Sequence, residues 1–210
     1  MPRASRSPEQ IQKVKDRIFE AALQYMTEEG YGNLSMRKLA QKAGMTAANI
    51  YNYYTNKDEI YLALQTRGFN LLYRQFRSGY ESSNDPVEKL EAMIRAYVDF
   101  GVNNSAYYNI MFSWDVPKYI DYVGTELEPI AYLEKEAGLN NIEITAEVIN
   151  EIRQTRGLTK TENSWHLGIQ LWITLNGLVS LINSRVLPEV DQNLDLIKEQ
   201  TIKRLMEMFA

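Results

Sequence analysis

Residues 34–57 read LSMRKLAQKAGMTAANIYNYYTNK, and this stretch decides the fold. It contains two helix starts, in each of which a hydroxyl residue that can cap a helix stands just before the first turn. Ser35 and Thr46 are these residues, and each is flanked by apolar residues placed to staple the chain as it enters the helix. Gly44 lies between the two starts and permits the backbone angle of a sharp corner. The two short helices that this stretch predicts are 35–42 and 46–53.

The rest of the chain also has helical spacing. Apolar residues recur at intervals of three and four, and no segment shows the sustained alternation typical of a half-buried strand. The first helix ends before Gly30, and Asn56 with Glu59 forms a capping box for a helix at about 57–79. We therefore expect an all-α protein with an N-terminal three-helix domain at 1–56 and a larger helical bundle at 57–210.

Proline, glycine and asparagine mark the later boundaries. Asp85 and Pro86 begin one helix, and Pro117 begins another, which Pro129 kinks or restarts. Residues 138–161 read as loops around one amphipathic helix. The remaining predicted helices are 106–113, 145–155, 162–185 and 192–209.

Composition excludes several classes of site. The 210 residues include no cysteine, which excludes disulfides, thiolate metal sites and cysteine nucleophiles. His166 is the single histidine, which argues against a zinc site. The N-terminus lacks the apolar core of a signal peptide, and no apolar run reaches the length of a membrane span. We expect a cytoplasmic protein without a metal or cofactor and without a membrane partner.

The charge is divided unevenly along the chain. Residues 1–70 hold ten Lys/Arg against seven Asp/Glu, a net charge of +3, whereas residues 71–210 carry −7. Such an asymmetry fits a phosphate-facing head on an acidic body, even though the whole chain has a net charge of −4.

One face of the second short helix has chemistry suited to DNA. Ala47 and Ala48 are small enough for the backbone to approach a major groove, and Asn49 and Asn52 offer amide donors and acceptors to base edges. Arg37, on the preceding helix, is placed to reach a guanine edge or a phosphate. Hydroxyl and ammonium groups suited to phosphate oxygens surround this face: Thr46, Tyr51, Tyr53 and Lys57. Five apolar positions are expected to point inward and lock the two helices together: Leu39, Ala40, Ala43, Ile50 and Tyr54.

The pattern from about residue 14 to 62 resembles the tetracycline-repressor (TetR) family. The matching positions are Glu29-Gly30-Tyr31, Arg37-Lys38-Leu39-Ala40, Ala43-Gly44, Ile50-Tyr51, Tyr54 and Lys57. The resemblance implies that Arg37, Ala47, Ala48, Asn49 and Tyr51 face bases, while Thr46, Tyr53 and Lys57 grip phosphate. Tyr53 departs from the family pattern, which most often has histidine there.

Two later segments, 104–112 and 171–178, resemble the subgroup marked by a Trp…His-Gly motif. Asn176 replaces the histidine of that motif. An interior packing role would tolerate this exchange.

A ligand site is predicted from aromatic content and from the resemblance. Aromatic residues of the larger domain either line a cavity for a flat or apolar compound or fill the core between helices. His166 is either a ligand contact or simply a packed residue beside Trp165. The candidates for ligand contact are Tyr97, Tyr108, Phe112, Trp114, Trp165, His166 and Trp172.

Two apolar stripes on the last two helices predict a homodimer. They would form a four-helix contact between two copies, which is also where the family dimerises. The alternative is burial within one subunit. The predicted interface residues are Leu167, Leu171, Leu175, Leu178, Ile182, Leu194, Ile197 and Leu205.

Together these features predict a transcriptional repressor that binds a palindromic operator in double-stranded DNA and is released by a small-molecule inducer. An activator or a ligand-independent DNA-binding protein is the alternative. A helical enzyme is disfavoured because no paired carboxylates, activated nucleophile or phosphate loop is evident. Arg3, Arg6, Lys13 and Arg17 belong either to a solvated tail and surface or to an arm that contacts DNA.

Overall fold

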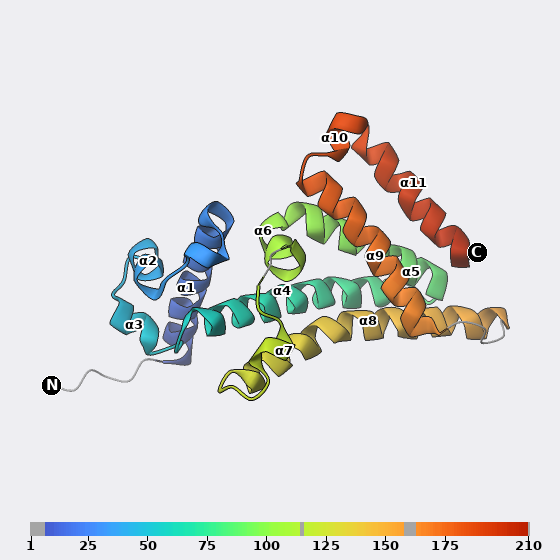
Figure 1. Cartoon of the computed structure of the whole chain (residues 1–210). Coiled ribbons are helices and arrows are strands. Elements are labelled where there is room, and N and C mark those ends of the chain that lie inside the picture. Colours follow the sequence, from blue (N-terminus) through green and yellow to red (C-terminus); the bar gives the residue numbers. More distant parts are fainter. Residues whose placement is uncertain (1–6, 114–115, 158–162, 210) are drawn as a thin grey trace. The chain divides into compact units, whose positions relative to one another are not determined.

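The computed structural model describes residues 7–113, 116–157 and 163–209, and the regular structure in these ranges is helical throughout (Figure 1). This confirms the all-α prediction. The elements are α1 (Pro8–Glu29), η1 (Tyr31–Asn33), α2 (Met36–Lys42), α3 (Ala47–Tyr51), α4 (Lys57–Tyr80), α5 (Pro86–Asn103), α6 (Ser105–Tyr108), η2 (Asn109–Ser113), α7 (Tyr119–Tyr122), α8 (Glu128–Arg156), α9 (Ser164–Asn183), α10 (Leu187–Val190), α11 (Leu194–Met206) and η3 (Glu207–Phe209).

The chain packs as two compact units. The head unit comprises Met1–Gln65 and Trp114–Glu134, and the body unit comprises Thr66–Ser113 and Lys135–Ala210. Among the described residues, the head thus includes 57–65 and 116–134 in addition to 7–56. The functional division into 1–56 and 57–210 remains a prediction.

In the head, α1 packs on α2, and α2 packs on α3. Each of these three helices begins at a capping side chain. Ser7 forms a capping box with Gln10, and the Ser35 hydroxyl accepts a hydrogen bond from the Lys38 backbone N–H at 3.3 Å. These contacts satisfy amide groups that have no partner inside the helix. The predicted start at Ser35 is therefore confirmed.

The segment between η2 and α8 differs from the prediction. A long helix from Pro117 is wrong, because α7 ends at Tyr122 and Gly124 has a φ of 79°. That left-handed conformation suits glycine and interrupts a helix. The Tyr122 side chain packs in a small cluster with Leu62 and Ala131. The next helix begins at Glu128, so the restart near Pro129 is confirmed.

The predicted loop at the start of 138–161 is also wrong, because α8 continues unbroken from Glu128 to Arg156. Two contacts with α4 explain why glycine and asparagine are accommodated here. Gly138 lies close to the Phe69 ring, where a side chain's Cβ would approach within 3.4 Å. The Asn141 amide donates hydrogen bonds to the backbone carbonyls of Ala137 and Phe69, at 2.9 and 3.3 Å.

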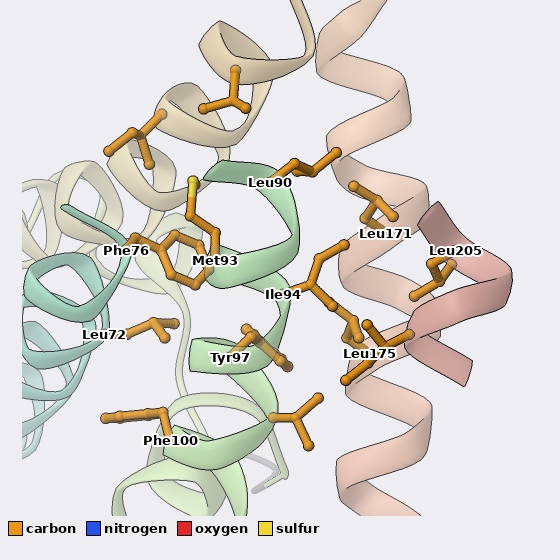
Figure 2. Close-up of a cluster of buried hydrophobic side chains, with 14 of the residues drawn as sticks. Leu72, Phe76, Leu90, Met93, Ile94, Tyr97, Phe100, Leu171, Leu175 and Leu205 are labelled. Carbon is orange, nitrogen blue, oxygen red and sulfur yellow. The ribbon is translucent and has the colours of Figure 1, made fainter. Parts of the chain in front are cut away.

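The body is organised around α5. Figure 2 shows α5 between α4 on one side and α9 on the other, and α11, which carries Leu205, packs on both α5 and α9. Leu90, Met93, Ile94, Tyr97 and Phe100 all lie on α5 and are at most 3% exposed. Burial on both sides explains why apolar residues cover more than one stripe of this helix.

One partly buried carboxyl group of the head has no ion-pair partner among the described residues. Glu134, on α8, faces Tyr61 of α4, Tyr122 of α7 and Lys118. Burial raises the pKa of Glu134 to about 7, and the Lys118 ammonium opposes that shift. Between about pH 4.5 and pH 7, the Glu134 carboxyl is therefore protonated to a larger extent in the folded head than in the unfolded chain.

We expect the free energy of unfolding to fall as pH rises from about 4.5 to about 7, because the unfolded chain loses this proton at a lower pH than the folded head does. The exchange Glu134→Gln should remove this component and leave the variant more stable than the wild type at pH 8. Urea denaturation of both proteins at several pH values measures the difference. Identical pH profiles would show that Glu134 ionises freely in the folded head.

Candidate nucleic-acid interface

The two short helices of the head are held together by apolar side chains. Leu39 of α2 and Ile50 of α3 are completely buried. All five predicted inward positions are at most 5% exposed: Leu39, Ala40, Ala43, Ile50 and Tyr54. The predicted inward face is therefore confirmed.

The turn between α2 and α3 is tightened by a residue of α1. Gly44 has a φ of 62°, and its carbonyl accepts a hydrogen bond from the Arg17 guanidinium at 3.3 Å. A Cβ at position 44 would lie 2.6 Å from that guanidinium, so a side chain there would displace Arg17. This structural contact of Arg17 was not predicted. Lys13 is exposed on α1, whereas Arg3 and Arg6 lie outside the described residues.

Two capping arrangements set the ends of the candidate surface. The Thr46 hydroxyl accepts from the Asn49 backbone N–H at 3.2 Å, which leaves its own proton available to a phosphate oxygen. At the start of α4, Asn56 accepts from the Glu59 N–H at 2.9 Å, and the Glu59 carboxylate accepts from the backbone N–H and hydroxyl of Thr55. Lys57 is thereby fixed as the first residue of α4.

The structure places every predicted DNA contact at the surface of the head. Tyr51 projects most clearly, with 55% of its surface exposed. The exposed residues are Arg37, Thr46, Ala48, Tyr51 and Asn52, and the half-buried ones are Ala47, Asn49, Tyr53 and Lys57. α3 therefore buries one side and presents the opposite side, with the small and amide-bearing residues, to solvent.

Four of the predicted ligand contacts come together in the body. The Phe112 ring lies 6.3 Å from Tyr97, 5.3 Å from Tyr108 and 5.9 Å from Trp172, measured between ring centroids. Trp165 and His166 lie instead in the first turn of α9, where Trp165 is half-buried and His166 is exposed. Trp114 lies outside the described residues.

Asn176 has an interior role beside this aromatic cluster. Its side-chain oxygen accepts hydrogen bonds from the hydroxyls of Tyr108 at 2.6 Å and Tyr97 at 3.3 Å. Burial raises the pKa of Tyr108 to about 12, so its phenol remains a donor at neutral pH. Asn176 thus satisfies two buried hydroxyls from α5 and α6.

The predicted dimer residues differ in how much surface they leave exposed within one subunit, and their role in a dimer stays a prediction. Five of them are at most 8% exposed within their own subunit and have almost no surface left for a second copy: Leu167, Leu171, Leu175, Leu178 and Leu205. Ile182, Leu194 and Ile197 are half-buried. The apolar residues of α9 that face outward are Ile173, which is 61% exposed, and Leu181, which is 44% exposed. These two residues were not among the predicted interface residues.

Comparison with family models gives two matches. Residues 18–64 match the model described as bacterial regulatory proteins of the tetR family, and residues 90–205 match a tetracyclin repressor-like C-terminal domain. The second match alone covers more than half of the chain. The Trp-His-Gly subgroup remains a prediction.

Curated proteins that are similar in sequence to this chain are named as transcriptional regulators. The activator FasR of Mycolicibacterium smegmatis is 27% identical over 101 residues, which are 48% of this chain and 46% of that protein. The repressor KstR2 of Mycobacterium tuberculosis is 26% identical over 88 residues, 41% of this chain and 44% of the repressor. The matches thus span just under half the length of these curated relatives.

A solved structure shares the fold over nearly the whole chain. FadR from Bacillus subtilis, solved in complex with stearoyl-CoA, superposes with a TM-score of 0.70. The superposition covers 91% of this chain and 97% of FadR, at 17% sequence identity.

The exposed Tyr51 provides a direct test of the α3 surface. We expect Tyr51→Ala to weaken binding to duplex DNA by roughly tenfold, since a lost contact of about 1 to 2 kcal/mol has that effect. Thermal stability should hardly change, because the ring is exposed. Titration of fluorescent DNA with each protein, alongside circular dichroism, measures both quantities. A large loss of stability would mean that Tyr51 serves the core of the head.

Proposed function

Because the chain belongs to the TetR family of bacterial regulatory proteins, we propose that it is a cytoplasmic, homodimeric repressor that binds a palindromic operator and is released by a small molecule with an apolar part. The observation that carries this proposal is the outward face of α3. There a buried Ile50 holds the helix, while Ala48, Tyr51 and Asn52 remain exposed.

The outward side of α9 supports a dimer with a second copy. Ile173, Gly177 and Leu181 are spaced four residues apart, so they share one side of the helix. A Cβ at Gly177 would meet nothing within 4 Å, so this glycine serves no packing contact inside the described subunit. A small residue between two apolar ones lets two helices approach closely.

The composition of α9 agrees with this assignment. By length and composition alone, α9 is apolar enough to cross a membrane. About a third of its most apolar stretch is buried within the described subunit. Core helices pass the same test. A helix that buries one side in its own subunit and another in a partner accounts for the high hydropathy.

The proposed mechanism is a change of spacing between the two heads. Two recognition helices of a dimer reach successive major grooves when they lie about 34 to 36 Å apart, one turn of DNA. A ligand that prefers a splayed dimer by about 3 kcal/mol would lower operator affinity by roughly two orders of magnitude. α4 is a suitable transmitter, because it begins in the head and ends in the body.

We propose the body as the ligand-binding part and an acyl-CoA as the first ligand class to test. The aromatic cluster around Phe112 offers apolar contacts to an acyl chain. FadR, which shares the fold, was solved with stearoyl-CoA. An activator remains the second candidate function, because FasR bears that name.

Selection of genomic DNA fragments by the full chain tests DNA binding. We expect recovery of a palindrome whose half-site centres are separated by about one helical turn, bound in a strongly salt-dependent manner. Stearoyl-CoA added to the complex should release the DNA. Retention of the DNA would exclude this ligand, and a reporter gene whose expression rises with the protein would identify an activator. Failure to enrich any sequence would contradict the proposed function.

The dimer surface has its own test. We expect Ile173→Lys to shift the protein toward monomers, because burying an unpaired ammonium in an apolar interface is unfavourable by several kcal/mol. Light scattering coupled to size exclusion measures the mass. Ile120→Lys is the matched control, since Ile120 is 74% exposed and belongs to α7 of the head and not to α9. An unchanged mass for the Ile173 variant would place the interface elsewhere.

A further inference from the structure

Lys57, a predicted phosphate contact, lies against an aromatic ring that belongs to another part of the head. Its ammonium is 4.5 Å from the centroid of the Tyr31 ring, in η1. The other stacked lysines of the described head are farther from their rings, at 5.8 Å for Lys38 over Tyr25 and 5.7 Å for Lys15 over Tyr54. At the shorter distance the ring face attracts the cation and limits its motion.

The Tyr31 ring is itself held on two sides. Its hydroxyl donates a hydrogen bond of 2.5 Å to the Asp58 carboxylate, the residue that follows Lys57. Its ring packs at a tilt on Tyr61, with 4.8 Å between ring centroids, and Tyr61 is completely buried. Burial and then the Asp58 hydrogen bond raise the pKa of Tyr31, so the phenol stays protonated and continues to donate.

The stacked arrangement leaves the charge of Lys57 available. Lys42 offers a contrast, because its ammonium forms an ion pair with Glu28 at 2.5 Å. Among the described residues, no carboxylate forms an ion pair or hydrogen bond with the Lys57 ammonium. A ring face attracts a cation without carrying a net charge, so the N–H donors that point away from the ring remain free for a phosphate.

We propose that Tyr31 is a positioning residue for DNA binding, which holds the Lys57 ammonium at the surface in the orientation that meets a phosphate. This inference rests on the proposed DNA-binding function. The Asn56 cap of α4 and the Glu59 contact with Thr55 fix the Lys57 backbone, and Tyr31 restricts its side chain. The lysine therefore loses little further freedom when it binds DNA.

The test compares Tyr31→Leu, Tyr31→Phe, Lys57→Ala and the double variants in the full chain. The probes are a random-sequence 30-base-pair duplex, a length of about three turns of DNA, and any palindrome that the selection recovers. Lys57→Ala should make the slope of log affinity against log salt concentration less steep, by the amount that corresponds to about one phosphate contact. Tyr31→Leu should weaken binding roughly two- to fivefold and move the salt dependence in the same direction.

The double variants distinguish positioning from a general structural role. In the Lys57→Ala background, changing Tyr31 should have no further effect on affinity. Tyr31→Phe keeps the ring and should retain most of the affinity. It also serves as the folded Tyr31 variant if Tyr31→Leu does not fold. Tyr25→Leu is the matched control, because it removes the ring beneath Lys38, which lies outside the predicted contacts, and should leave the salt dependence unchanged.

Additive losses from Tyr31→Leu and Lys57→Ala, or an unchanged salt dependence in the Tyr31→Leu variant, would overturn the positioning role while leaving DNA binding intact. A wild-type chain that binds neither duplex at low salt would instead overturn the proposed function, and this inference with it.

Discussion

The burial of Ile50 against the rest of the head is the contact on which the candidate DNA surface depends. α3 has only five residues, and a helix of that length does not persist alone in water. It is held by its apolar side, by the Thr46 cap and by the Gly44 turn that Arg17 braces from α1. Because these constraints use only the inward side and the ends of α3, Ala48, Tyr51 and Asn52 are left to face outward.

The charged groups of the head are arranged in two ways. The Lys42 ammonium is neutralised in an ion pair with Glu28, whereas Lys57 rests on the neutral face of Tyr31. A cation held on a ring keeps its full charge toward a polyanion, while an ion pair must first be broken or shared. This difference allows a chain with a net charge of −4 to present free positive charge at one end.

The body illustrates how one helix can serve two surfaces. Leu171 and Leu175 of α9 pack toward α5, as Figure 2 shows, and Ile173 points to solvent. The interior also contains a polar contact, because Asn176 accepts hydrogen bonds from two buried tyrosines. Such paired groups favour one packing arrangement of α5, α6 and α9, since a slip would leave the hydroxyls unsatisfied.

Local patterns in the sequence determined the helical class, the capped starts at Ser35, Thr46 and Asn56, and the inward and outward positions of residues 34–57. These features depend on neighbours within one or two turns. The tertiary structure alone decided that α8 continues through Gly138 and Asn141, that residues 116–134 pack with the head, and that Leu171 belongs to the core of its own subunit. Hydrophobic periodicity shows which side of a helix is apolar, but it does not identify the partner. That partner is set by contacts between residues distant in the chain, such as Phe69 with Gly138 and Tyr31 with Lys57.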